Sequence, residues 1–360
     1  MNHNTQIIKQ GYLGNGQLMD TDSMRPYLNK QGVPVVAEVA GMKLNADGKQ
    51  IPQYRERRVY TQALLRKYEW EMIDAEVLDV MRQPLVGVSD LLSSGLTHNI
   101  GDVGVSISTY EQLSDMSDAD VSMSLTPRKG ENDRVEFTPV SIPIPIISKP
   151  FTLDLRTLAA SRRGAGEAVD VTQARTATRK VREQLEEMLF NGSTLSVQTF
   201  AIYGYTTHPR RATGAAAAFG GADWGTTQGN AHKTIVGMMQ ALVNLGAVGP
   251  FGLYVNNTQY SEILQLNGDG NIAESQLTTI LRTVPDLKFV RRAPRLDAGE
   301  AVLVQMTKET VDLAIGMDVT PVSWQEYGGM VNEFRVMTAV VPRVKYDANN
   351  SCAVAHVTGI

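Results

Sequence analysis

Apolar side chains recur at three- and four-residue intervals in several stretches of the chain, which is the periodicity of a helix with one buried face. The longest stretch runs from Asp170 to Phe190. Asp170 can cap its start, and Asn191-Gly192 is a typical stop. Such a helix is about 30 Å long at 1.5 Å per residue. Its stripe consists of Val171, Ala174, Thr178, Val181, Leu185 and Met188.

Shorter patterns of the same kind predict four further helices, at residues 61–81, 233–245, 258–266 and 275–282, with Pro84 marking the end of the first. Apolar runs predict strands at 251–256, 287–291, 300–306, 311–315, 319–325, 331–341 and 350–357. Helices in the middle of the chain, with strands before and after them, favour an α+β protein whose ends return to one sheet.

Residues 101–147 alternate between apolar and polar positions on both sides of a charged tip that contains a glycine. This pattern predicts a long β-hairpin. Pro139, Pro143 and Pro145 fit poorly in a central strand, so we expect edge structure. An open edge is an aggregation hazard in a monomer, but it is a means of association in a protein that assembles.

Residues 1–60 differ from the rest because they are rich in Gly, Asn and Pro and their apolar runs are short. Asn45-Ala46-Asp47-Gly48 is typical of a turn between two short strands. A segment with so little to bury is expected to be an arm that gains order by lying on another surface.

Composition and charge narrow the classes of function. Of 360 residues, 42% are hydrophobic and 20% charged, which favours a globular protein with a real core. The net charge of -4 gives no basic excess of the kind that tight nucleic-acid binders carry. The single cysteine, Cys352, excludes an intrachain disulfide and is expected to be buried. The sequence shows neither a signal peptide nor a membrane span.

The residue patterns of catalytic and metal sites are missing. No two of the five histidines have helical ligand spacing, and none lies beside an acidic metal partner. Gly164–Ala168 lacks the ending of a phosphate loop, and Asn267–Asn271 lacks the closing Glu of a calcium loop. We therefore expect no enzyme activity, no catalytic residue, no metal and no cofactor. The histidines are His3, His98, His208, His232 and His356.

Four stretches of the chain lie at 64–87, 150–192, 246–264 and 316–357. Together they resemble encapsulins, and the tailed-phage major capsid proteins that share the encapsulin fold, in consistent order over roughly 300 residues. Residues 150–192 resemble the peripheral-domain and spine-helix region, and 246–264 (GAVGPFGLYVNNTQYSEIL) resemble the axial-domain strand and helix. Residues 316–357 resemble the closing strands, and 64–87 resemble the encapsulin N-terminal helix. The chain departs from encapsulins in carrying some sixty residues before that helix.

The resemblance implies an arm (1–60), an N-terminal helix region (61–100), an extended loop (101–147) and two domains. The peripheral domain would comprise 148–195 and 316–360, with its spine helix at 170–190, and the axial domain would comprise 196–315. It implies a structural subunit that assembles into the icosahedral capsid around the double-stranded DNA genome of a tailed phage. The alternative is an encapsulin shell enclosing a cargo enzyme, and the added arm favours the phage capsid.

The implied partners are further copies, as hexamers and pentamers in a closed shell, and packaged DNA bound non-specifically through its backbone. Scaffold, portal and decoration proteins would join them, in a virion assembled in the host bacterial cytoplasm, without a membrane. Basic residues of the spine helix are candidates for DNA contact, although pairing with Glu183, Glu186 and Glu187 also explains them. These basic residues are Arg175, Arg179, Lys180 and Arg182.

Two clusters are candidate contact sites between subunits. The extended-loop tip would lie over a neighbouring subunit, although an ordinary solvated turn also explains its charges. Its residues are Arg128, Lys129, Glu131, Asp133 and Arg134. The resemblance places a second loop near the capsomer axis, with Asn267, Asp269 and Asn271. Some family members join subunits covalently through a Lys and an Asn, and Lys129 is the candidate here.

Overall fold

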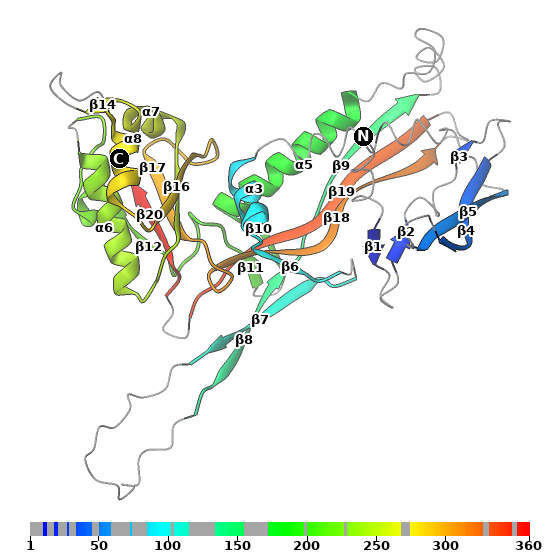
Figure 1. The fold of residues 1–360 in the computed structure, drawn as a ribbon, viewed down its shortest axis with the longest axis horizontal. Coiled ribbons are helices and arrows are strands. Elements are labelled where there is room, and N and C mark those ends of the chain that lie inside the picture. Colours follow the sequence, from blue (N-terminus) through cyan, green and yellow to red (C-terminus); the bar gives the residue numbers. More distant parts are fainter. Residues whose placement is uncertain are drawn as a thin grey trace, which may run out of the picture.

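The computed structural model has two lobes and a ribbon that projects from between them (Figure 1). It describes residues 85–101, 104–114, 134–154, 172–197, 200–226, 229–267, 274–326, 331–347 and 351–360. It also describes Ile73 and the backbone of five strands near the N-terminus. These strands are β1 (Gln10–Tyr12), β2 (Leu18–Asp20), β3 (Tyr27–Leu28), β4 (Pro34–Leu44) and β5 (Gln50–Arg58).

The first lobe is a four-stranded sheet with a long helix on one face (Figure 1). The helix, α5 (Thr172–Asn191), is the predicted spine helix, and the cap expected at Asp170 lies outside the described residues. In the first half of strand β19, Phe334 and Val336 alternate with half-exposed neighbours, so one side is buried there, whereas all residues from Thr338 to Val344 are buried. The strand order is β6 (Thr97–Asn99), β18 (Val311–Glu326), β19 (Val331–Val344) and β9 (Ile146–Asp154).

The second lobe is a five-stranded sheet covered on one face by helices (Figure 1). The strand order is β12 (Ala212–Ala215), β20 (Val354–Thr358), β17 (Glu300–Gln305), β13 (Phe251–Val255) and β16 (Leu287–Arg292). The helical elements are η1 (Ala216–Phe219), α6 (Asn230–Asn244), α7 (Asn257–Ile263) and α8 (Gln276–Thr283). Strands β13 and β17 are buried on both sides. One face packs against the helices, and the other packs against the core shared with the first lobe.

The last strand corrects the expected division of the chain. Residues 316–360 were predicted to close the peripheral lobe, but β20 pairs with β12 and β17 in the five-stranded sheet. The chain therefore leaves the first lobe after β19 and returns to the second. The apolar run along 350–357 predicts a strand correctly, but it carries no information about the strand's partners.

Most other predicted elements are confirmed, with shifts of a few residues at their ends. The helices predicted at 233–245, 258–266 and 275–282 correspond to α6, α7 and α8. The strands predicted at 311–315 and 319–325 are one strand, β18, whose pairing is irregular between Ile315 and Thr320. The helix predicted at 61–81 lies outside the described residues except Ile73, which is helical and buried. Helix α3 (Val86–Ser93), beyond Pro84, was missed.

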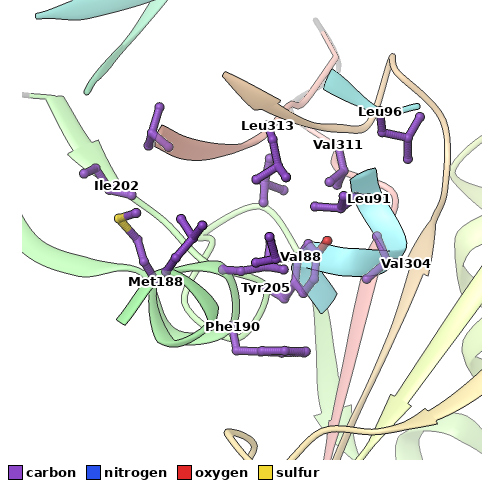
Figure 2. Close-up of a cluster of buried hydrophobic side chains, with 14 of the residues drawn as sticks. Val88, Leu91, Leu96, Met188, Phe190, Ile202, Tyr205, Val304, Val311 and Leu313 are labelled. Atoms are coloured by element: carbon purple, nitrogen blue, oxygen red, sulfur yellow. The ribbon is translucent and has the colours of Figure 1, made fainter. Parts of the chain in front are cut away.

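The two lobes share one hydrophobic core, which gathers around α3 (Figure 2). Val88 and Leu91 of α3 contact a cluster that includes Leu189 and Phe190 at the end of α5. Tyr205 joins this cluster from the segment that follows β10 (Ser193–Val197) and β11 (Phe200–Ile202). Because β17 and β18 also contribute Val304 and Leu313, this cluster joins the two lobes, while the face of the five-stranded sheet that the helices cover has a second core of its own (Figure 2).

Leu189→Ala is expected to lower the free energy of unfolding by about 2–5 kcal/mol, because Leu189 is fully buried and the change leaves a cavity. Gln184→Ala on the exposed side of the same helix is the control and should change it by less than about 0.5 kcal/mol. Thermal or denaturant unfolding of the two variants checks this, and equal effects would contradict the assigned core.

Candidate functional site

The ribbon is the predicted hairpin. Strands β7 (Ile107–Leu113) and β8 (Phe137–Pro143) pair antiparallel, from Ile107 with Pro143 to Leu113 with Phe137. Within the described part of the chain no third strand joins them, and the ribbon extends away from both lobes (Figure 1). The expectation of edge structure is thus confirmed, since both long edges of the ribbon are open.

The ribbon changes from buried to exposed along its length. At its root Ile142 and Ile144 enter the shared core. Towards the far end Phe137 is 61% exposed. A two-stranded ribbon is marginally stable by itself, and unpaired strand edges are available for pairing with another chain. These properties fit a surface that another molecule covers.

A buried ion pair stands at the root of the ribbon. Arg343 of β19 donates from Nε and Nη2 to the two carboxylate oxygens of Asp312 on β18, at 2.6 Å each. Lys345 Nζ lies 2.8 Å from Asp312 Oδ2, and Arg343 Nη1 donates to Ser108 Oγ of β7 at 2.8 Å. Burial alone would raise the pKa of Asp312, but the hydrogen bonds and charges of Arg343 and Lys345 hold it below the ordinary value.

Asp312→Asn is expected to destabilise the fold by about 3–5 kcal/mol, because Arg343 would keep a buried charge without its counter-charge. The depressed pKa of Asp312 means that its stabilisation is present above the unfolded value, about 3.9, and is lost as the pH falls through the folded value. Unfolding midpoints between neutral and strongly acidic pH check both statements. The wild-type advantage over D312N should shrink in acid, and a constant difference would contradict the assignment.

A second buried carboxylate holds α3 to the spine helix. Backbone N–H groups of Gly87 and Val88 donate to Glu186 Oε1 and Oε2 at 2.8 and 3.1 Å. Leu85, the N-cap residue, supplies no side-chain bond, so a residue 99 positions away caps this helix. Gly87 permits the approach, because a Cβ there would come within 2.7 Å of Leu189 Cδ2. Burial raises the pKa of Glu186, although the backbone donors act against the rise.

The other side of α3 is bonded to the five-stranded sheet. Tyr254 of β13 donates its hydroxyl to Asp90 Oδ2 at 3.3 Å, and Arg291 Nε of β16 lies 3.6 Å from the same oxygen. Burial raises the pKa of Asp90. Phe190 meets Tyr254 edge to face at a centroid distance of 5.4 Å. Helix α3 therefore links the two lobes by polar and apolar contacts together.

Glu186→Ala should cost about 1–2 kcal/mol through loss of the α3 cap, whereas Glu186→Gln keeps an acceptor and should cost less. A raised pKa means that this carboxyl favours the fold most when protonated, below the unfolded value of about 4.3, and that the benefit is lost as the pH rises through the folded value. The stability of E186Q relative to wild type should therefore fall on acidification. A difference that does not change with pH would show that Glu186 does not titrate as assigned.

The spine-helix charges differ from the expectation at two positions. Arg182 and Glu186 are 6% and 2% exposed, so neither lies on the surface, where a DNA contact of Arg182 or a surface pairing with Glu186 was expected. Arg179 and Lys180 do pair with Glu183, at 3.5 and 2.7 Å. Glu183 and Glu187 also pair with a residue that the sequence did not single out, Arg295, at 3.6 and 3.5 Å. Arg175 is exposed.

Most of the predicted subunit contacts lie outside the described residues: Arg128, Lys129, Glu131, Asp133, Asp269 and Asn271. Arg134, which is described, is exposed where the chain returns towards β8. Asn267 ends β14 (Leu266–Asn267), which pairs with β15 (Glu274–Ser275) at the far end of the second lobe (Figure 1). These residues therefore stay predictions.

The described ranges contain neither a cluster of metal-ligating side chains nor a helix that could span a membrane. No three His, Cys, Asp or Glu side chains there gather closely enough to hold a metal ion. None of the helices described is both long and apolar enough to cross a bilayer. Cys352 is buried as expected, and burial raises the pKa of its thiol to about 12.

Sequence reasoning missed the residues that fix the ribbon and α3. Ser108 and Arg343 are 235 positions apart, and Glu186 and Gly87 are 99 apart, so no local spacing reveals either contact. One signal was present: Asp312 and Arg343 are charged residues that each lie between apolar neighbours in the sequence, Val311 and Leu313 for Asp312, and Pro342 and Val344 for Arg343. Such charges are expected to be paired with one another.

Comparisons with known proteins agree with this architecture. A model of a family of unknown function, DUF6260, matches residues 60–357. Among curated proteins, the type 1 encapsulin shell protein EncA of Myxococcus xanthus is 27% identical over 289 residues, which are 78% of this chain and 91% of that protein.

Two solved structures are similar to the whole arrangement. The virus-like particle from Pyrococcus furiosus superposes with a TM-score of 0.57 and 17% identity, over 81% of this chain and 99% of that one. The capsid of Myoviridae phage XM1 gives 0.59 and 15%, over 77% and 94%. At these identities the likeness shows a shared fold, which confirms the predicted α+β phage-capsid and encapsulin type.

Proposed function

Because the chain belongs to the DUF6260 family and has the fold of phage capsid and encapsulin shells, we propose that it is a shell-forming subunit, the major capsid protein of a tailed phage. Copies of the chain would repeat one set of heterologous contacts, as hexamers and pentamers, until the surface closes. The proposal concerns structure and assembly, and it assigns the chain no catalytic step.

The open ribbon carries this proposal. Its root is buried in the subunit, but Phe137 and both long edges are left uncovered by the chain's own described residues. A surface of this kind is an aggregation hazard unless a partner covers it. A neighbouring copy is the partner that a shell supplies at every position. The charged tip, with Arg128, Lys129, Glu131, Asp133 and Arg134, would then set register on that neighbour.

The two lobes would take the peripheral and axial roles of the capsid fold. In this arrangement the β14–β15 end of the second lobe, with Asn267, Asp269 and Asn271, faces the capsomer axis. Spine-helix residues Arg175, Arg179 and Lys180 would contact packaged DNA through its backbone. Scaffold, portal and decoration proteins would complete a virion assembled in the bacterial cytoplasm.

An encapsulin shell around a protein cargo is the second candidate. The similarity to EncA, over 91% of that protein, favours it. The arm favours the capsid, because the family match begins at residue 60 and the strands β1 to β5 precede it. An arm suits a larger shell, in which it can cross onto neighbouring subunits.

Negative-stain microscopy of the purified wild-type protein tests the proposal. We expect closed icosahedral particles, and nuclease-protected DNA in particles made with the partner proteins of the phage. Particles that instead carry a co-purified protein cargo would favour the encapsulin. A uniform oligomer of only a few subunits would refute both.

Phe137→Asp should abolish or greatly reduce particle formation, because it places a charge on the apolar surface that a neighbour would cover. Phe137→Leu keeps an apolar side chain at the same exposed position and is the control. Both subunits should keep their thermal midpoint, since exposed substitutions change stability by about 0.5 kcal/mol or less. Equal particle yields from both variants would contradict the role of Phe137.

A further inference from the structure

One face of β7 is directed at the body of the subunit. Alternate residues Ser108, Tyr110 and Gln112 are buried or half-buried, whereas Thr109 and Glu111 between them are exposed. Side chains two apart share a face of a strand, so these three form one line of contact. Tyr110 packs against the shared core in the middle of the line, between a polar residue at each end.

The inner end of the line is fixed by Arg343. Its guanidinium is held by both carboxylate oxygens of Asp312, and the pair is almost completely buried. The bond from Arg343 Nη1 to Ser108 Oγ is added to a pair that is already neutralised. Loss of the Ser108 hydroxyl would therefore release the ribbon without exposing an unpaired charge.

The outer end of the line is fixed by Gln112. Its Nε2 donates to the backbone carbonyls of Tyr346 and Asp347, at 3.0 Å each. This backbone is itself held, because Asp347 and Ser351 exchange two hydrogen bonds, from Asp347 N–H to Ser351 O at 3.0 Å and from Ser351 N–H to Asp347 Oδ1 at 2.8 Å. Ser108 and Gln112 are four residues apart, or about 13 Å along a strand.

The hydrogen bonds of Ser108 and Gln112 are here called the two tethers of the ribbon. Because they are about 13 Å apart, with Tyr110 between them, they fix the direction of β7 as well as its point of attachment. Both tethers end on residues 343–347, which continue from β19. The direction of the ribbon is thus tied to the first lobe, as one body with its sheet.

We propose that Ser108 and Gln112 are positioning residues that set the direction in which the ribbon leaves the subunit, and through it the curvature of the shell. This inference rests on the proposed function. In a repeated heterologous contact, the angle between neighbours decides whether and at what size the assembly closes. A ribbon freed from its tethers would reach the neighbour over a range of angles.

The experiment compares wild type with Ser108→Ala, Gln112→Ala and the control Thr109→Ala. Thr109 Oγ1 lies 3.1 Å from Ser141 Oγ across the exposed face, so T109A removes a hydroxyl within the ribbon and leaves both tethers intact. Gln112→Ala does not touch the buried ion pair, so it keeps the test valid if S108A fails to fold. Ser108→Thr, which restores a hydroxyl, is the rescue variant.

Three readouts are taken: the thermal midpoint, the distribution of particle diameters, and amide exchange of 107–113 and 137–143 by mass spectrometry. S108A and Q112A should keep a midpoint near that of wild type and give broader or shifted diameters. Their ribbon amides should exchange about ten-fold faster, because S108A loses the hydrogen bond from Arg343 and Q112A loses the two hydrogen bonds from the Gln112 side chain. T109A and S108T should behave as wild type.

The inference is overturned if S108A and Q112A give wild-type diameters and wild-type exchange. It is also overturned if T109A changes the diameters as much as they do. If wild type forms no particles, the proposed function fails, and the assignment of curvature fails with it. Faster exchange in S108A than in T109A would then still identify the tether, which separates the two failures.

Discussion

The position of α3 is the constraint on which the two-lobed structure depends, and the buried carboxylate of Glu186 fixes that position. A free helix start would leave backbone donors unsatisfied inside the core, at a cost comparable to that of lost hydrogen bonds. Glu186 satisfies two of them from α5, and Gly87 lets the helices approach closely enough for this. Asp90, one turn further, then receives Tyr254 of the other lobe. The lobes are thus joined through a short helix that belongs fully to neither.

The direction of the ribbon depends on a buried ion pair, Arg343 with Asp312. Arg343 and Asp312 on adjacent strands are hydrogen-bonded to one another, and Nη1 of Arg343 donates to Ser108. Buried ion pairs of this kind contribute little net stability, because desolvation offsets the attraction. They do restrict geometry, since the planar guanidinium can donate only in fixed directions. The pair therefore matters for where the ribbon is directed more than for how stable the subunit is.

Much of this fold could be predicted from periodicity alone, and the failures share one physical cause. The stripe from Ala174 to Met188 determines a helix wherever it packs, so α5 could be predicted to within two residues. Glu186 lies beside Leu185 in a mixed-charge stretch, and its burial is decided by α3, far away in the sequence. The strand at 354–358 could be predicted, but its neighbours could not, because an apolar run does not encode which strands it pairs with. The shell interpretation came from the order of the elements, since no motif in the chain carries it.

The position of β20 has a consequence for the timing of synthesis. This strand lies between β12 and β17, so the five-stranded sheet lacks an inner strand until residues 354–358 have been made. Until then β12 has no partner in that sheet, and the edge of β17 that pairs with β20 is open. The pairing of β12 with β20 joins residues that are far apart in the sequence. Such pairings form late, because closing the long loop between them costs entropy before any contact forms. A chain that has not been made as far as residue 358 therefore lacks a complete second lobe, and its open strand edges remain available for wrong pairing until β20 is in place.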